Sequence, residues 1–241
     1  GESAMQRHLQ EAKEQVGSGL AALDIRSTTL AAAEAVVEET ERRPYDLVVL
    51  GLGSADSIAL AERILEAGEH HLLLIPCSQP PPKHALICLA NGEPGKEGVL
   101  FTGRLVRHFG TQAKLLTILP ESANDQESQD RARRFLAGGV RALQSFGVAA
   151  EIAVGSGTIH DGIVSELKNG GHDLLVLGAP LPDLAGKIAL DGVVGQLLRE
   201  VKDCSILIVR SSSQEQGTLL PLPLSAVVPV SVRFSTLAAK I

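Results

Sequence analysis

Three polar residues in the second half of the chain have the types that a hydrolytic site needs. Ser156 could act as a nucleophile, His160 as a base, and Asp161 as the group that orients the base. Asp161 is adjacent to His160, however, so it is not a separate residue that reaches the imidazole from behind. Thr158 and Asp161 also have the spacing of a helix N-terminus, which is the simpler interpretation. We therefore expect a helix start here and predict that the chain is not an enzyme.

The histidines and cysteines do not have the spacing of a metal site. His70 and His71 are adjacent, so at the start of a strand they would point to opposite faces and could not share a metal ion. The cysteines are Cys77, Cys88 and Cys204, an odd number at wide spacing in or beside apolar segments. This pattern argues against a disulfide framework and against zinc, and it favours a reducing, cytoplasmic setting.

Two glycines stand where a phosphate-binding loop would begin. The sequences DLVVLG at 46–51 and DLLVLG at 173–178 are typical of buried strands, and they end in Gly51 and Gly178. Glycine lets the backbone come close to a ligand, and the N–H groups at a helix N-terminus bind phosphate. The segment GLGSA at 51–55 lacks the third glycine of a dinucleotide-binding motif, so we interpret it as a strand-to-helix turn.

The two hexapeptides belong to a longer repeat. A shift of 127 positions (173 − 46) aligns the first strand with its later copy, and a shift of 134 (205 − 71) aligns residues 71–75 with residues 205–209. The first copy is therefore seven residues shorter (134 − 127) directly after Gly51. The second copy alternates apolar strands with helix-period segments, which predicts an α/β fold whose parallel sheet has helices on both faces.

The composition is that of a globular protein without a nucleic-acid partner. A chain of 241 residues with 44% hydrophobic residues can bury one large core or two smaller ones. A net charge of −6 and 2% aromatic residues provide neither a basic face nor stacking platforms for nucleic acid. No apolar run reaches the roughly 18 to 20 residues of a membrane helix, so we expect no direct membrane insertion.

Residues 84–210 resemble a universal stress protein domain, and residues 1–77 resemble the later part of another. The resemblance lies in the opening strand that ends in Asn91-Gly92-Glu93, the strand 173–178, the helix after the glycine loop and the closing strand. It implies an α/β fold of two doubly wound, Rossmann-like parallel-sheet domains. It also implies that these domains pack as a tandem pseudo-dimer through their closing strands.

One loop separates the ATP-binding members of that family from the others. ATP binders carry GxxG, nine residues, and then glycine followed by serine or threonine. Here Gly178 supplies the first glycine, but Leu181, Asp191 and Gly192 occupy the other three signature positions. A slip of one residue restores Gly192 as the third glycine but leaves no hydroxyl residue after it. The resemblance thus implies a degenerate site with Asn91, Gly178 and Gly192 as the candidate nucleotide-binding residues.

Charge and loop length both argue against nucleotide binding. If Asp191 points at the phosphates from about 4 Å, the repulsion is roughly 4 kcal/mol per unit charge at an effective dielectric near 20, or about a thousandfold in affinity. The seven residues absent after Gly51 are most of the phosphate loop of the first copy. We expect no cofactor, and the alternative is ATP or AMP in the second domain only.

The remaining segments are linkers and a tail. Residues 78–83 are predicted to form a stiff proline-rich linker, and residues 211–241 a linker with an apolar tail. The first copy lacks the opening strand, helix and second strand. Segment 225–232 aligns with 84–91 at a shift of 141 (225 − 84), which places Ser231 at the position of the family's aspartate.

Three interpretations of the tail follow. It could begin a further repeat of a longer protein, fold back to supply the missing strand of the first copy, or pack as an apolar segment on a neighbour. We prefer the first because the helix after the strand is cut short.

Together these patterns predict a universal stress protein-like regulatory or interaction module, which could be the cytoplasmic part of a larger protein such as a transporter. Its expected partner is a protein, or a second copy bound through the closing strands. The alternative is an ATP- or AMP-binding stress sensor that acts through the second domain.

Overall fold

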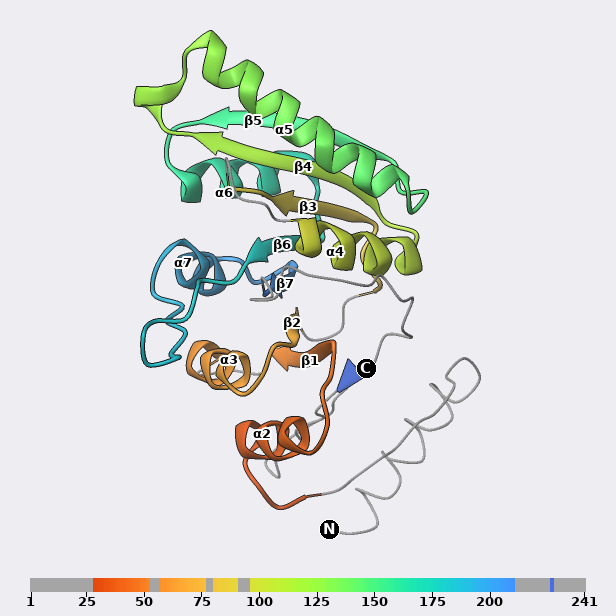
Figure 1. Cartoon of the computed structure of the whole chain (residues 1–241), viewed down its shortest axis with the longest axis vertical. Helices are drawn as coiled ribbons and strands as arrows, with labels where there is room; N and C mark the ends of the chain where they lie inside the picture. Colours follow the sequence, from red (N-terminus) through yellow and green to blue (C-terminus); the bar gives the residue numbers. More distant parts are fainter. Residues whose placement is uncertain (1–27, 53–56, 77–79, 91–95, 211–225, 228–241) are drawn as a thin grey trace. The chain divides into compact units, whose positions relative to one another are not determined.

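The computed structural model describes residues 28–52, 57–76, 80–90, 96–210 and 226–227. The chain forms two compact units, Gly1–Ala31 and Ala32–Ile241. In the first unit, the N–H of Leu30 donates to Oγ1 of Thr28 at 3.1 Å. The sheet and the helices described below belong to the second unit (Figure 1).

The second unit alternates helices and strands for most of its length. The α-helices are α2 (Ala32–Arg42), α3 (Ser57–Glu66), α4 (Lys96–Phe109), α5 (Gln126–Gln144), α6 (Ile159–Gly170) and α7 (Val193–Glu200). A short 3-10 helix, η1, covers Glu121–Ala123. The strands are β1 (Leu47–Leu52), β2 (His71–Pro76), β3 (His84–Cys88), β4 (Gln112–Leu119), β5 (Ala150–Ser156), β6 (Leu174–Gly178), β7 (Ser205–Val209) and β8 (Ala226–Val227).

All eight strands form a single sheet in the order β5-β4-β3-β6-β7-β2-β1-β8. Every neighbouring pair is parallel except β2 and β7, which run antiparallel. The predicted α/β class with a largely parallel sheet is therefore confirmed. The sheet has two halves. Strands β1, β2 and β8 form the first half, strands β3 to β7 form the second half, and the two halves join through β2 and β7. The predicted boundary at 78–83 and the tandem pseudo-dimer packing stay predictions.

The repeat found in the sequence recurs in the strand pairing. The pairs β1–β2 and β6–β7 have the same register when the shifts of 127 and 134 are applied to their residues. The first hydrogen bond is also the same in both. The N–H of His71 donates to the carbonyl of Asp46 at 2.9 Å, and the N–H of Ser205 donates to that of Asp173 at 3.0 Å.

The core lies on both faces of the sheet because successive side chains of a strand point to opposite sides. On β6, Leu175 and Leu177 pack with α2, α3, α6 and α7 on one face, whereas Leu174 and Val176 pack with α4 and α5 on the other. Figure 1 shows α4 and α5 together on one side of β3 and β4. The predicted covering of the sheet by helices on both faces is confirmed.

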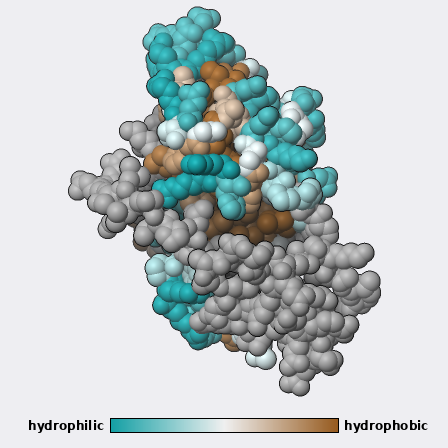
Figure 2. Space-filling model, turned by 90° about the vertical axis from the view of Figure 1, so that its right-hand side faces the viewer, coloured by the Kyte–Doolittle hydropathy of each residue, from teal (hydrophilic) through white to brown (hydrophobic). Residues whose placement is uncertain are grey.

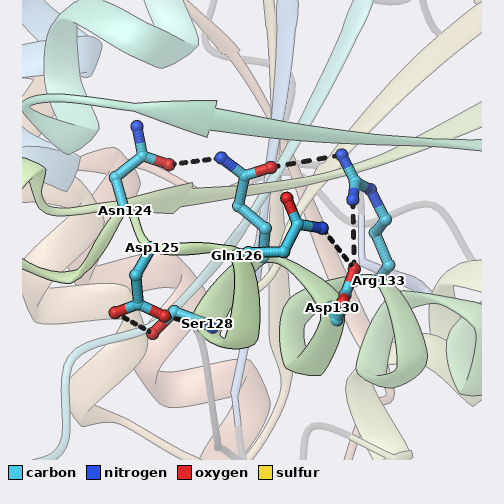
Figure 3. A network of polar contacts seen from close by, with 7 residues as sticks. Asn124, Asp125, Gln126, Ser128, Asp130 and Arg133 are labelled. Atoms are coloured by element: carbon cyan, nitrogen blue, oxygen red, sulfur yellow. Dashed lines mark hydrogen bonds and ion pairs between the residues drawn. The ribbon is translucent and has the colours of Figure 1, made fainter.

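Helix α5 begins at a polar network (Figure 3). The side chain of Asp125 caps the helix by accepting the N–H of Ser128 at 2.8 Å. Hydrogen bonds from Ser128 lower the pKa of this carboxyl below its ordinary value. Further along the first turns, Asp130 accepts a hydrogen bond from the Gln126 amide at 3.0 Å and from Arg133 at 3.3 Å. These exposed contacts fix where α5 starts and carry no sign of a binding site.

Figure 2 shows one side of the molecule, on which much of the described surface is hydrophilic with smaller hydrophobic patches between. In the described part of the chain, no helix has the length and apolar character needed to cross a membrane.

Candidate functional site: the loop between β6 and α7

The loop between β6 and α7 starts at the carboxyl end of strand β6. Gly178 ends β6 and is exposed, and a Cβ added there would meet no atom within 4 Å. The N–H of the next residue, Ala179, donates to the carbonyl of Val209 at 2.8 Å. The first residue of the loop is therefore still hydrogen-bonded to β7.

The middle of the loop is a turn built around Asp183. Its Oδ1 accepts the N–H groups of Ala185 and Lys187, each at 2.8 Å. The N–H of Asp183 donates to the carbonyl of Lys187 at 2.8 Å, and Gly186 has a positive φ of 78°. A residue with a Cβ is strained in that conformation, so glycine is required at 186. The turn uses its own carboxylate to bind the amides that a phosphate loop would present.

The end of the loop is held by two carboxylates of α3, a helix from the other half of the sheet. The N–H of Ile188 donates to Oε1 of Glu66 at 3.2 Å, and the N–H of Leu190 donates to Oε1 of Glu62 at 2.8 Å. The side chains of Ile188 and Leu190 are buried in the core. Residues four apart lie on the same face of a helix, so both carboxylates reach the loop together.

Arg210, which follows β7, binds the C-terminal end of α3, next to the two carboxylates. Its Nη1 donates to the carbonyl of Leu65 and, at 2.6 Å, to that of Gly68. Its backbone N–H donates to Nδ1 of His71 at 3.0 Å. A cation at the C-terminus of a helix satisfies free carbonyls and interacts favourably with the helix dipole. The C-terminal part of α3 is thus held both by the loop and by Arg210.

The loop enters α7 by a close backbone contact. Gly192 is the N-cap of α7 and makes no side-chain capping bond, and Asp191 beside it is exposed. One turn later, a Cβ on Gly195 would lie 1.6 Å from the carbonyl oxygen of Leu190. Only glycine at 195 lets the loop pack against the first turn of the helix.

The structure places the predicted site residues as follows. Gly178 and Gly192 flank the loop, and Asn91 lies outside the described residues. The signature position Leu181 and its neighbour Leu184 are 77% and 111% exposed. Sequence reasoning missed Glu62, Glu66 and Arg210, for which the only local signal was two carboxylates one turn apart on one helix.

The hydrolytic trio considered for Ser156, His160 and Asp161 is not formed. Nδ1 of His160 lies 3.1 Å from Oδ1 of Asp161, and Nε2 lies 2.9 Å from Oε2 of Glu200 on α7. Both ring nitrogens face carboxylates, so neither is left for the Ser156 hydroxyl. Thr158 caps α6 by accepting the N–H of Asp161 at 3.1 Å, and the predicted helix start is confirmed.

The two cysteines in the described residues are poor nucleophiles. Burial raises the pKa of the Cys204 thiol to about 12, and the nearby Asp173 charge adds to the effect. Burial, with smaller effects from Glu166 and Cys204, also raises the pKa of Cys88. Neither thiol carries an appreciable thiolate fraction at neutral pH.

A partly buried polar cluster lies between β4, α6 and the start of β6. Oε1 of Glu166 accepts from Nζ of Lys114 at 2.9 Å and lies 3.3 Å from Nε2 of His172. Partial burial alone would raise the pKa of Glu166, but hydrogen bonds from Lys114 and His172 lower it overall. Nδ1 of His172 is buried without a hydrogen-bond partner among the described residues, and the Lys114–Glu166 contact has the geometry of a structural ion pair.

No three potential metal ligands gather anywhere in the part of the chain that the structure describes. A hollow of about 620 Å³ in the described part of the chain is open and lies between α5 and β5, away from the glycine loop. Its lining is Ala137, Val140, Arg141, Ala150, Glu151 and Ile152.

No protein-family model matches the sequence, and no curated protein matches it. Solved structures do. A universal stress protein from Archaeoglobus fulgidus DSM 4304 is 12% identical with a TM-score of 0.59, over 88% of this chain and 78% of that one. A protein of unknown function from Pseudomonas aeruginosa PAO1 is 12% identical with a TM-score of 0.61, over 87% and 77%. A universal stress protein in complex with cAMP is 20% identical with a TM-score of 0.45, over 55% of this chain and 100% of that one.

The first two matches extend over most of the chain and include both halves of the sheet. This chain therefore has the universal stress protein fold, and the predicted resemblance is confirmed at that level.

Proposed function

We propose that this chain is a universal stress protein-like regulatory or interaction module whose glycine loop no longer binds nucleotide. It has no catalytic role, and its partner is a protein. The observation that carries the proposal is the pair of hydrogen bonds from the amides of Ile188 and Leu190 to the carboxylates of Glu66 and Glu62. Two anions of the chain occupy donors at the end of the loop where phosphate would have to bind.

The energetic consequence can be estimated. A phosphate oxygen about 4 Å from one carboxylate is repelled by roughly 4 kcal/mol at an effective dielectric near 20. Glu66 is exposed and Glu62 half-buried, so solvent screening reduces this value. Even about 2 kcal/mol corresponds to roughly thirtyfold in affinity. The carboxylates on the loop therefore disfavour a triphosphate.

Several other amides of the loop are also committed. Pro180 and Pro182 have no N–H, and the turn at 183–187 binds its own amides through the side chain and carbonyl of Asp183 and the carbonyl of Lys187. A phosphate site needs several convergent donors at the helix N-terminus. The loop is built instead as a contact between the two halves of the sheet.

The outer side of the loop supports a role in protein contact. Leu181 and Leu184 are the most exposed large hydrophobic residues of the described chain, at 77% and 111%. They flank Pro182, which restricts the backbone between them. Two exposed leucines on a loop that is held by hydrogen bonds to α3 favour a protein partner over a nucleotide.

A second candidate function is an ATP- or AMP-binding stress sensor that acts through the β3–β7 half. The observation in its favour is the open space at Gly178 and Gly192, where an added Cβ would meet no atom within 4 Å. Under either function, the module acts in the cytoplasm, alone or as part of a larger protein such as a transporter.

One experiment separates the two functions. The melting temperature of the purified chain is followed with ATP and with AMP up to millimolar concentration. We expect no shift with either nucleotide. A rise of several degrees that Gly178→Val abolishes would establish the sensor and refute the proposal.

The role of the two carboxylates is tested in the same assay. The double variant Glu62→Gln/Glu66→Gln should melt at a lower temperature because two charge-assisted hydrogen bonds are weakened. Glu69→Gln is the matched control, because Glu69 is an exposed carboxylate just beyond the same helix. Equal melting of both variants and the unmodified chain would show that the contact does not hold the loop.

A further inference from the structure

Strand β1 has the composition of a central strand. All six residues of Leu47–Leu52 are leucine, valine or glycine, with no charged residue and no proline. At the opposite end of the sheet, the edge strand β5 carries Glu151 on its exposed side. An apolar strand of this length left at an edge is a template for aggregation, and proteins normally cover or charge such an edge. The outer edge of β1 therefore requires a covering strand.

The covering strand in this structure is β8, which comes from the far end of the sequence. Ala226 pairs with Leu47 and Val227 with Val48, in parallel. In the other half of the sheet, β3 pairs with β6 in the same way, through Ala85–Leu174 and Leu86–Leu175. In both pairs, one strand is a copy of the repeated apolar strand, β1 or β6, and its partner lies on the side away from β2 or β7.

The two pairings agree residue for residue. The shift of 127 takes Leu47 to Leu174, and the shift of 141 takes Ala85 to Ala226. These two shifts convert the pair Leu174–Ala85 into Leu47–Ala226, which is the pair observed. A slip of one residue would turn every side chain to the other face, so the register is a specific result.

We propose that β8 is the opening strand of the β1–β2 half, joined to it in permuted chain order, and that the outer edge of β1 is a binding surface for this strand. The surface selects a short apolar strand that runs parallel to β1. Of the three interpretations of the tail, this is the one in which it folds back to complete the first copy.

The occupant is the tail of the same chain. Along the sheet, β8 lies three strand spacings from β7, which is about 14 Å at about 4.8 Å per spacing. The 15 residues between Arg210 and Ala226 (226 − 210 − 1) could span up to roughly 50 Å. The tail therefore reaches the edge of β1 without help from a second copy.

Nuclear Overhauser contacts in the uniformly labelled full chain test the proposal directly. We expect contacts between the Leu47–Val48 and Ala226–Val227 backbones in the observed register. A mixture of two differently labelled preparations, unfolded and refolded together, should show none between different molecules. The absence of these contacts, or a register shifted by one residue, overturns the proposal. Contacts found only between different molecules also overturn it, because a second copy would then be the occupant.

A pair of proline substitutions provides an independent readout. Val227→Pro removes an N–H from β8 and should increase the hydrogen-exchange rate of the β1 amides at least tenfold. Leu222→Pro is the matched control, because residue 222 lies between Pro221 and Pro223 and precedes β8. Equal effects of the two substitutions, or no effect of either, would contradict the assignment of β8 to the edge of β1.

Discussion

Replacing Gly195 by alanine is the most direct test of the contact between the loop and α7. The added Cβ would lie 1.6 Å from the carbonyl oxygen of Leu190, whereas real Cβ contacts are essentially never under 3.0 Å. The backbone at 190 must therefore move by about 1.4 Å (3.0 − 1.6). Leu190 is fully buried and its N–H is bound to Glu62, so this movement is opposed on both sides.

The cost of that movement can be worked out from the contacts it disturbs. A shift of this size breaks or weakens the hydrogen bonds of Leu190 and Ile188, each worth about 1.5 to 3 kcal/mol when one partner is charged. Because the carboxylates are partly exposed, the two hydrogen bonds together contribute about 3 to 4 kcal/mol to stability. The higher helix propensity of alanine stabilises the variant by about 1 kcal/mol and offsets part of this loss. We expect Gly195→Ala to lower the free energy of unfolding by about 2 to 3 kcal/mol.

Urea unfolding of the full chain measures this effect, with Gly138→Ala as the control. Gly138 also lies inside a helix, but its Cβ would meet only an Arg141 side-chain nitrogen at 3.7 Å. That variant should be unchanged or up to about 1 kcal/mol more stable. If Gly195→Ala were as stable as Gly138→Ala, the close packing of the loop on α7 would be refuted.

Three further predictions concern Asp173, His70 and Cys204. Asp173→Ala should lower the free energy of unfolding by about 2 to 4 kcal/mol, because the Asp173 carboxylate accepts the N–H groups of Lys83 and His84 at 2.8 to 2.9 Å. Urea unfolding measures this free energy, and a change under 0.5 kcal/mol would show that these hydrogen bonds do not stabilise the fold. Burial, with a smaller effect of the Arg210 charge, lowers the pKa of His70. The unfolded chain then binds a proton at His70 more readily than the folded chain, so the free energy of unfolding should fall as the pH drops through about 6.5. His70→Phe should make the free energy of unfolding less dependent on pH in this range. An unchanged dependence would contradict the role of His70. The thiol of Cys204 should resist a thiol reagent at pH 7.5 in the folded chain and react fully in urea. Mass spectrometry locates the labelled cysteine. Equal labelling rates in the folded and unfolded chain would show that the thiol is not protected.

Much of the fold could be predicted from the sequence because it depends on local pattern and on repetition. Apolar runs bounded by polar residues marked the strands, and the shifts of 127 and 134 reproduce the pairing of β1 with β2 from that of β6 with β7. Thr158 and Asp161 likewise marked the start of α6 by spacing alone. Each of these signals lies within a few residues or within one copy of the repeat.

The candidate site could be predicted only in outline. Gly178 and Gly192 were found because a glycine after a strand is a local signal. The partners of the loop were not, because Glu66 and Glu62 are 122 and 128 residues away from the amides they bind. Nothing in the residues around α3 distinguishes these carboxylates from those of a solvated helix face. The contact follows from how the two halves join through β2 and β7.

The repeat allows the helices that follow the two glycine loops to be compared position by position. The shift of 134 makes α3 the counterpart of α7, so that Ala61 corresponds to Gly195. Ala61 is fully buried, and the first copy is seven residues shorter in the loop that precedes α3. Glycine is required at 195 because the longer loop of the second copy places the carbonyl oxygen of Leu190 against this position.

The same comparison extends to the carboxylates. The counterpart of Glu66 is Glu200, which pairs with His160 at 2.9 Å. The counterpart of Glu62 is Gln196 (62 + 134), which carries no charge. The pair of carboxylates that holds the loop between β6 and α7 is therefore specific to α3.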